Sequence, residues 1–141
     1  MAVNWRDCLE NRDAKSIHED QDLIKSLLIT SKNKEFSANA LKLMDETAVS
    51  KISLAYDSVR ELLEAWALNA GFKIYNHVCY TSFLREVIRD GDLAVDFDEL
   101  RIIRNDINYN GKQISLKEAD HVLRRLSNLR KKISGKINEK F

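Results

Sequence analysis

The residues best suited to chemistry lie in one stretch of the chain, Arg101-Ile-Ile-Arg-Asn-Asp-Ile-Asn-Tyr-Asn-Gly-Lys112. Positions three, four and seven apart share one face of a helix, so the spacing predicts a helix with polar groups on one side. The candidate ligand-binding side chains of this stretch are Arg101, Arg104, Asn105, Asn108, Tyr109 and Lys112. Guanidinium and amide groups beside a tyrosine can bind a phosphate and a base. The competing explanation is a face that is only solvated, as most polar helix faces are.

A second group of polar residues lies on an earlier predicted helix, over roughly 47–70. Asp57, Glu61 and Glu64 recur at spacings of four and three, and paired carboxylates can act as general acid and base. With Arg60 among them, however, the same spacing is the ordinary pattern of ion pairs on a helix surface. Surface pairing therefore explains these carboxylates better than catalysis does.

Motifs for metals, nucleotides and covalent catalysis are absent from the sequence. His18, His77 and His121 fall in separate predicted elements, and His77 with Cys79 makes only half of a tetrahedral metal site. No glycine-rich loop follows a strand, and no serine or cysteine stands in a nucleophile turn. Cys8 and Cys79 give neither a disulfide framework nor a zinc pattern, so we expect a reducing cytoplasm and no metal or cofactor.

The end of the chain is locally basic. Its cations are Arg124, Arg125, Arg130, Lys131, Lys132 and Lys136. They can neutralise several phosphates if they face one groove, although a solvated face explains most of them. If Lys112 and Arg104 point the same way as this helix, the patch becomes a surface for single-stranded RNA or a nucleotide, with Tyr109 available for stacking.

Composition favours a helical protein of one domain. The 141 residues include no proline and only four glycines, and 44% of them are hydrophobic, which is typical of helical proteins rather than turn-rich sheets. The formal net charge of +1 argues against a basic field over the whole molecule, so nucleic-acid binding needs a local patch. No apolar run has the length of a membrane span and the start lacks a signal-peptide core, which predicts a cytoplasmic protein without a membrane partner.

Apolar periodicity sets out the helices. It predicts a short helix capped by Asn4 and longer helices over roughly 20–45, 47–70, 79–88, 93–107 and 115–133. The charged segment 11–19 and the segment 72–76 are expected to be connections, the latter too short for an independent strand pair. Ser115 and Glu118 form a capping box that begins the last helix. Residues 134–141 are expected to fray.

Two segments resemble the HEPN domain superfamily of small prokaryotic helical proteins, in particular its archaeal-looking stand-alone members. They are Leu-Ala-Tyr-Asp-Ser-Val-Arg-Glu-Leu-Leu-Glu-Ala at 54–65 and Arg-Asn-Asp-Ile-Asn-Tyr-Asn-Gly-Lys at 104–112. The resemblance covers roughly residues 20–135. It implies a single all-α domain over 1–141, folded as an up-and-down bundle of four to five helices. Residues 1–19 form a short N-terminal segment of this domain. The resemblance also implies a homodimer in which the polar motifs of both protomers meet across a shared cleft.

Many members of that superfamily are metal-independent ribonucleases or the toxins of toxin–antitoxin pairs, often encoded beside a minimal nucleotidyltransferase. Their ribonuclease motif is an arginine, a polar residue and then a histidine, with four to six residues between arginine and histidine. Arg104 and Asn105 match the first half, but Tyr109 stands where four residues intervene after Arg104, and Asn108 where six intervene after Arg101, so the histidine is missing. Because an amide cannot exchange protons near neutral pH as imidazole does, acid–base cleavage loses its main group.

The sequence therefore predicts a HEPN-type nucleotide- or RNA-binding protein of a toxin–antitoxin or defence system, without the motif histidine of a nuclease. The predicted cleft adds Tyr56 and Arg60 to the residues of the 101–112 stretch. One alternative is a helical interaction module whose partner, such as a nucleotidyltransferase antitoxin, contacts the same surface. Another is a metal-independent endoribonuclease with Arg104 and Tyr109 as its catalytic residues. A structural role for Arg104, paired with Asp57, Glu64 or Asp106 across the dimer, is the remaining alternative.

Overall fold

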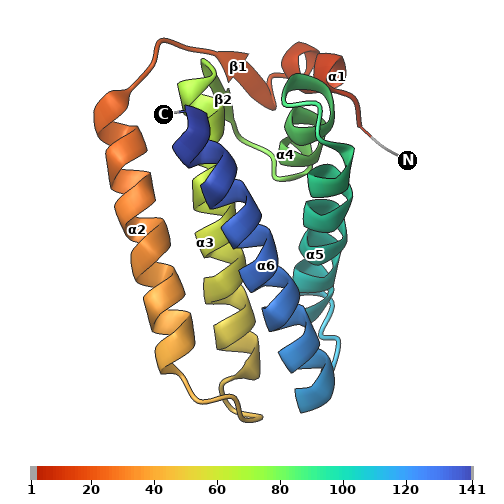
Figure 1. Ribbon diagram of the computed structural model, residues 1–141. Helices are drawn as coiled ribbons and strands as arrows, with labels where there is room; N and C mark the ends of the chain where they lie inside the picture. The colour runs from red at the N-terminus through yellow and green to blue at the C-terminus, as the bar shows by residue number, and fades with distance from the viewer. Residues whose placement is uncertain (1–2, 141) are drawn as a thin grey trace.

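The computed structural model describes residues 3–140, and its regular structure is almost wholly helical. Four long helices alternate in direction along the bundle (Figure 1): α2 (Gln21–Ala40), α3 (Ala48–Asn69), α5 (Gly91–Tyr109) and α6 (Leu116–Lys140). The predicted all-α fold is confirmed. Within the described residues, we find no helix that combines the length and the apolar character needed to span a bilayer.

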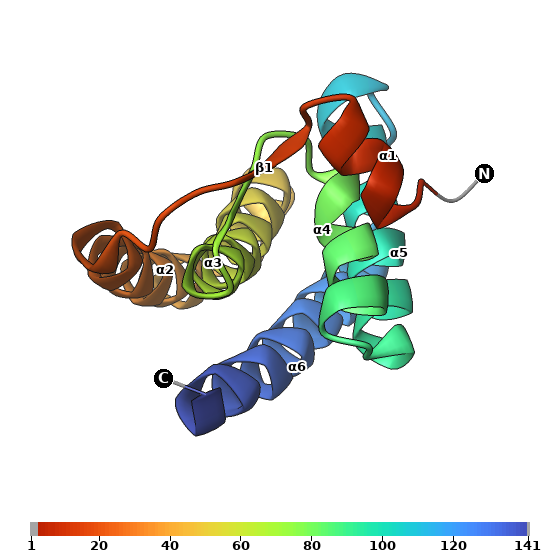
Figure 2. The same ribbon diagram turned by 90° about the horizontal axis from the view of Figure 1, so that it is seen from above.

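Helix α3 lies at the centre of the bundle. It contacts α2, α5 and α6, and α2 and α3 form a pair beside which α6 lies obliquely (Figure 2). A helix that packs on several sides must be apolar around much of its circumference. Its buried residues, Ile52, Val59, Leu62, Leu63 and Trp66 among them, meet this requirement.

A two-stranded sheet closes one end of the bundle. Strand β1 (Ala14–Ser16) pairs antiparallel with β2 (Phe72–Ile74), with Ala14 opposite Ile74. The prediction that these segments are mere connections is therefore wrong. Each strand is too short to be recognised alone, and its partner lies far away in the sequence, so local periodicity carried no signal for the pair.

The two cysteines also meet at this end. Helix α1 (Trp5–Glu10) packs against α4 (Val78–Ser82), and a disulfide joins Cys8 to Cys79 across 71 residues of sequence. The expectation that these two cysteines give no disulfide framework is corrected, because wide separation along the chain says nothing about separation in space. The expected reducing compartment rested on the absence of a disulfide, so this bond removes that basis.

Helix ends follow local capping where caps are present. Asn4 accepts from the Asp7 amide and begins α1, and Ser115 with Glu118 forms the predicted capping box of α6. Gly111, with φ at 66°, follows the end of α5 as predicted.

Two helix ends differ from the prediction. Helix α2 ends at Ala40 rather than near residue 45, because Lys51 donates to the Ala38 and Leu41 carbonyls at 2.5 and 2.6 Å. Helix α6 continues to Lys140 rather than fraying from 134, because Ile137 is still buried in the core; residue 141 lies outside the described residues. Helix α4 also runs on into a π-helical turn, η1 (Phe83–Val87).

Candidate ligand-binding site

Arg104 lies at the centre of a group of aromatic and charged side chains contributed by α3, α5 and the start of α4. Its guanidinium carbon lies 5.0 Å from the ring centroid of Tyr56 and 5.4 Å from that of Tyr109. Nη1 donates to the Tyr109 hydroxyl at 3.2 Å and to Asn105 Oδ1 at 3.4 Å. Two rings therefore fix the guanidinium through cation–π contacts that leave its positive charge in place.

We call this group the Arg104 cluster. Its members are Tyr56, Asp57, Arg60, His77, Tyr80, Arg101, Arg104, Asn105 and Tyr109. Six of them, all on α3 or α5, were predicted as ligand-binding residues: Tyr56, Arg60, Arg101, Arg104, Asn105 and Tyr109.

The guanidinium of Arg104 has few close acceptors within the chain. Its nearest carboxylate oxygen, Oδ1 of Asp57, is 3.9 Å from Nη2, and Asp57 also lies 4.0 Å from Lys34. Among the described side chains, the buried Nε of Arg104 has no hydrogen-bond partner. Because buried donors are almost always paired, this nitrogen marks a place where an acceptor from outside the chain, solvent included, is favoured. Asp106, by contrast, accepts from Asn110 at 3.0 Å.

The other two arginines of the cluster are more fully paired. Arg101 donates from Nε and Nη2 to Oδ1 of Asp98 at 3.1 and 2.9 Å, and the same oxygen accepts from Thr81 at 2.9 Å. This chain of contacts ties α5 to α4. Arg60 lies 3.5 Å from Glu64, four residues along α3, in the surface pairing that the sequence predicted. Both arginines still add positive charge around their neighbours.

His77 is one of the members that sequence reasoning missed. Its Nδ1 lies 3.1 Å from the Tyr56 hydroxyl, and its ring is half-buried. Burial, together with the charges of Arg60 and Arg104, lowers the pKa of His77 to about 4, so the imidazole is neutral at pH 7. Burial raises the pKa of Tyr56, which therefore stays protonated. Helical spacing in the sequence could not place His77 in the cluster, because His77 lies in the loop before α4 and only tertiary packing brings it next to Tyr56.

Two predicted ligand-binding residues lie outside the cluster. Asn108 is exposed and donates to the Ser53 hydroxyl at 3.2 Å. Lys112 follows Gly111 and lines a separate hollow with Ile103 and His121. The left-handed turn at Gly111 takes the chain out of the helix, so helical spacing no longer places Lys112 on the Arg104 face.

The remaining charged candidates are largely paired. Glu61 accepts from Lys34 at 2.6 Å. Arg124 pairs with Asp120 at 2.9 Å on α6, and Arg125 bridges to α5. The basic appearance of the last helix is therefore partly offset by acidic neighbours.

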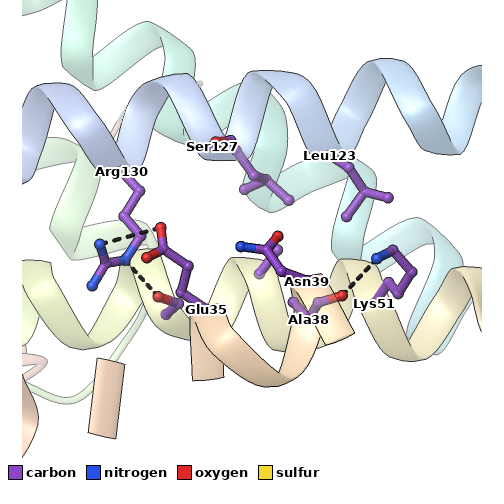
Figure 3. Close-up of a pocket in the computed structure, with 10 residues that line it drawn as sticks. Glu35, Ala38, Asn39, Lys51, Leu123, Ser127 and Arg130 are labelled. Atoms are coloured by element: carbon purple, nitrogen blue, oxygen red, sulfur yellow. Dashed lines mark hydrogen bonds and ion pairs between the residues drawn. The ribbon is translucent and has the colours of Figure 1, made fainter. Parts of the chain in front are cut away.

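A second buried arginine lines the small cavity between α2, α3 and α6 shown in Figure 3. The cavity has a volume of about 70 Å³. Arg130 donates from Nε to the Ser58 hydroxyl at 2.7 Å and from Nη2 to the Ser31 hydroxyl at 3.2 Å, and its Nη1 lies 3.3 Å from Glu35. We call these four residues the Arg130 cluster. Its polar groups satisfy one another, so it serves to join three helices.

Comparison with known proteins finds no family model that matches the chain and no curated protein that matches it. The HEPN resemblance rests on segments 54–65 and 104–112 and stays a prediction. Among the described side chains, no group of three or more histidines, cysteines, aspartates or glutamates is placed to hold a metal ion.

Proposed function

We propose that the Arg104 cluster binds the phosphate of a nucleotide or of single-stranded RNA, in a HEPN-type protein of a toxin–antitoxin or defence system that pairs as a homodimer. The observation that supports it most is the state of Arg104 itself. Two tyrosine rings hold the guanidinium, no carboxylate lies within 3.5 Å of it in the described contacts, and its Nε has no acceptor. A phosphate offers the oxygens that such a guanidinium lacks.

Tyr109 supplies a reason to favour an RNA or nucleotide over a bare anion. Its side chain is 71% exposed although its ring contacts Arg104. An exposed aromatic ring next to a phosphate-binding arginine can stack on a base, and such stacking contributes about 1–3 kcal/mol per base. Asn105, on the same face of α5, adds an amide for hydrogen bonding.

Binding of labelled single-stranded RNA at low and moderate salt tests this function. Arg104→Ala should weaken binding by about 10- to 100-fold, the effect of losing a charge-assisted phosphate contact. The control is Arg124→Ala, which removes the same charge from an arginine that is 78% exposed and paired on α6; its affinity should change by less than about twofold. A folded Arg104→Ala protein that binds RNA as tightly as wild type would overturn the proposal.

A protein-interaction module is the second candidate function. Val95 and Ile102, seven residues apart on α5, are 58% and 46% exposed, and Tyr109 follows seven residues later. An apolar line on one helix face fits a helix of a second copy or of a nucleotidyltransferase partner. The salt series separates the two functions, because RNA binding weakens steeply as salt rises and an apolar interface does not. Sedimentation equilibrium tests the homodimer.

A further inference from the structure

A second cation, Lys51, lines the cavity between α2, α3 and α6 that also contains Arg130. Lys51 lies in the first turn of α3 and is 9% exposed, and its Nζ donates to the carbonyls of Ala38 and Leu41 at 2.5 and 2.6 Å. An ammonium carries three donors, so one N–H of Lys51 has no acceptor among the described contacts. None of the ion pairs between described residues involves Lys51. Buried charges are normally paired, so this cavity holds a cation that no carboxylate of the described chain neutralises.

The charged residues that line the cavity carry one excess positive charge. They are the two cations Lys51 and Arg130 and the single carboxylate Glu35. Glu35 lies 3.3 Å from Nη1 of Arg130 and offsets its charge, so the excess charge belongs to Lys51. A ligand with one negative charge would complete the site, whereas a dianion would bring in a charge that the cavity cannot pair.

The rest of the lining divides into a polar and an apolar part. Asn39 of α2 and Ser127 of α6 are exposed and bring an amide and a hydroxyl to the cavity. Figure 3 shows Asn39 between the Arg130–Glu35 pair and Lys51, with Ser127 on the α6 side. The apolar part of the lining consists of Ala38, Ala55, Leu123 and Leu126. Such a lining suits a molecule with an anionic group at one end and hydrocarbon at the other.

The volume of the cavity sets the size of that molecule. One water needs about 10–15 Å³ of such space, so a cavity of about 70 Å³ has room for about five or six non-hydrogen atoms. Propionate and butyrate have this size, and a nucleotide is far too large. Charge, polarity and volume therefore agree on a short-chain monocarboxylate.

We propose that the cavity between α2, α3 and α6 binds a short-chain organic carboxylate. Its carboxylate group accepts from Lys51, Asn39 and Ser127 in charge-assisted hydrogen bonds, and its hydrocarbon chain packs on the apolar lining. Because α2 packs mainly on α3 (Figure 2), a ligand held by these three residues adds a link between α2 and α6. The site is separate from the Arg104 cluster, none of whose residues lines this cavity, so either site can hold without the other.

Propionate is the probe, and propionamide, a neutral molecule of nearly the same shape, is its control. Each is titrated into the wild-type protein at constant ionic strength while proton–nitrogen magnetic resonance spectra are recorded. Propionate should move the backbone amide signals of Ala38, Asn39, Lys51 and Ser127 with one Kd of about 1–10 mM, because so small a ligand makes few contacts. Propionamide should bind about tenfold or more weakly, since it lacks the charge. Equal binding of the two molecules, or propionate shifts that spread over the exposed lysines without saturating, would overturn the proposal.

Two substitutions on α6 form a matched pair. Ser127→Leu places a larger side chain at the cavity from an exposed position, so the fold should persist while propionate binds about tenfold or more weakly. Asn128→Leu adds the same side chain to the next residue, which is exposed and does not line the cavity, so its Kd should stay within about twofold of wild type. Equal Kd values in the two variants would show that propionate binds elsewhere.

Lys51→Met tests the charge itself. Methionine keeps an unbranched side chain but offers no donor, so propionate affinity should fall about tenfold or more. The change also removes two hydrogen bonds at the end of α2, so circular dichroism must first show wild-type helix content. If the variant does not fold, the Ser127→Leu and Asn128→Leu pair decides the question. A folded Lys51→Met protein with wild-type affinity for propionate would overturn the assignment of Lys51.

Discussion

The side chains of Arg104 and Arg130 are buried to the same extent, but their guanidinium groups differ in how many hydrogen-bond and ion-pair partners they have. Each side chain is 14% exposed. Arg130 reaches two hydroxyls and a carboxylate at 2.7 to 3.3 Å, whereas the carboxylate nearest Arg104 is 3.9 Å away and its Nε has no partner. An unpaired buried donor costs about 1–3 kcal/mol, so the chain carries that cost at Arg104 and avoids it at Arg130. The contrast separates an arginine that holds helices together from one that is available to a ligand.

The surroundings of the two arginines explain the difference. Ser31 and Ser58 each donate to the backbone carbonyl of the other across α2 and α3, at 2.6 and 2.7 Å. Arg130 links α6 to this pair of serines through its hydrogen bond to the Ser58 hydroxyl. Around Arg104, aromatic rings replace hydroxyls. A ring attracts a cation without accepting its hydrogen bonds in full, so that Arg104 is fixed in position but keeps unused donors.

The largest expected effect is on stability and distinguishes the two arginines directly. Arg130→Ala should lower the free energy of unfolding by about 3 kcal/mol, because it removes several hydrogen bonds of one charged group. Arg104→Ala should lower it by about 1 kcal/mol, the loss of its cation–π contacts being offset by removal of an unsatisfied donor. Urea unfolding followed by circular dichroism measures both. Equal losses in the two variants would break the comparison.

The next effect depends on pH and belongs to the Arg104 cluster alone. The pKa of His77 is lowered to about 4 in the folded chain, against about 6.5 when unfolded. As the pH falls from about 6.5 to about 4, the unfolded chain binds a proton that the folded chain does not, so stability falls by about 2 kcal/mol over this window. Well above pH 6.5 His77 is neutral in both the folded and the unfolded chain, so it contributes no pH dependence to the free energy of unfolding there.

Urea midpoints between pH 7.5 and pH 4.5 measure this dependence. His77→Gln should flatten the part of the curve that lies below about pH 6.5, while His121→Gln should follow the wild type. Arg130→Ala should lie below wild type by a similar amount at pH 7.5 and pH 5.5, because its guanidinium keeps its charge at both. A His77→Gln curve parallel to wild type would show that the imidazole titrates normally in the fold.

The sequence predicted those parts of the fold that depend on local spacing. The apolar repeat of α3 places Ile52, Val59 and Trp66 in the core, and the caps at Asn4 and Ser115 begin α1 and α6. Each of these features is decided by residues within a few turns of one another, where periodicity and capping act.

Features made by distant segments were not predictable in the same way. The β1–β2 pair and the disulfide both require the start of the chain to return to residues 72–79. His77 joins the Arg104 cluster for the same reason, since the loop before α4 folds back beside α3 and α5. Helical spacing did place Arg101 and Arg104, three residues apart, on one face of the helix. It could not show which arginine of that face is satisfied, because Asp98, Thr81 and Asp57 decide that through three-dimensional contacts.

The smallest expected effects come from single hydroxyl groups, one in each cluster. Tyr109→Phe removes the hydroxyl that accepts from Arg104 at 3.2 Å at an exposed position, so stability should change by about 0.5 kcal/mol or less and RNA affinity by about twofold. Ser58→Ala removes a fully buried hydroxyl that Arg130 uses, and should lower stability by about 1–2 kcal/mol without changing RNA affinity. Tyr109→Ala, which removes the stacking ring itself, should weaken RNA binding by about tenfold or more. If Tyr109→Phe costs as much stability as Ser58→Ala, then Arg104 is held by its hydrogen bonds after all and the two clusters have the same architectural role.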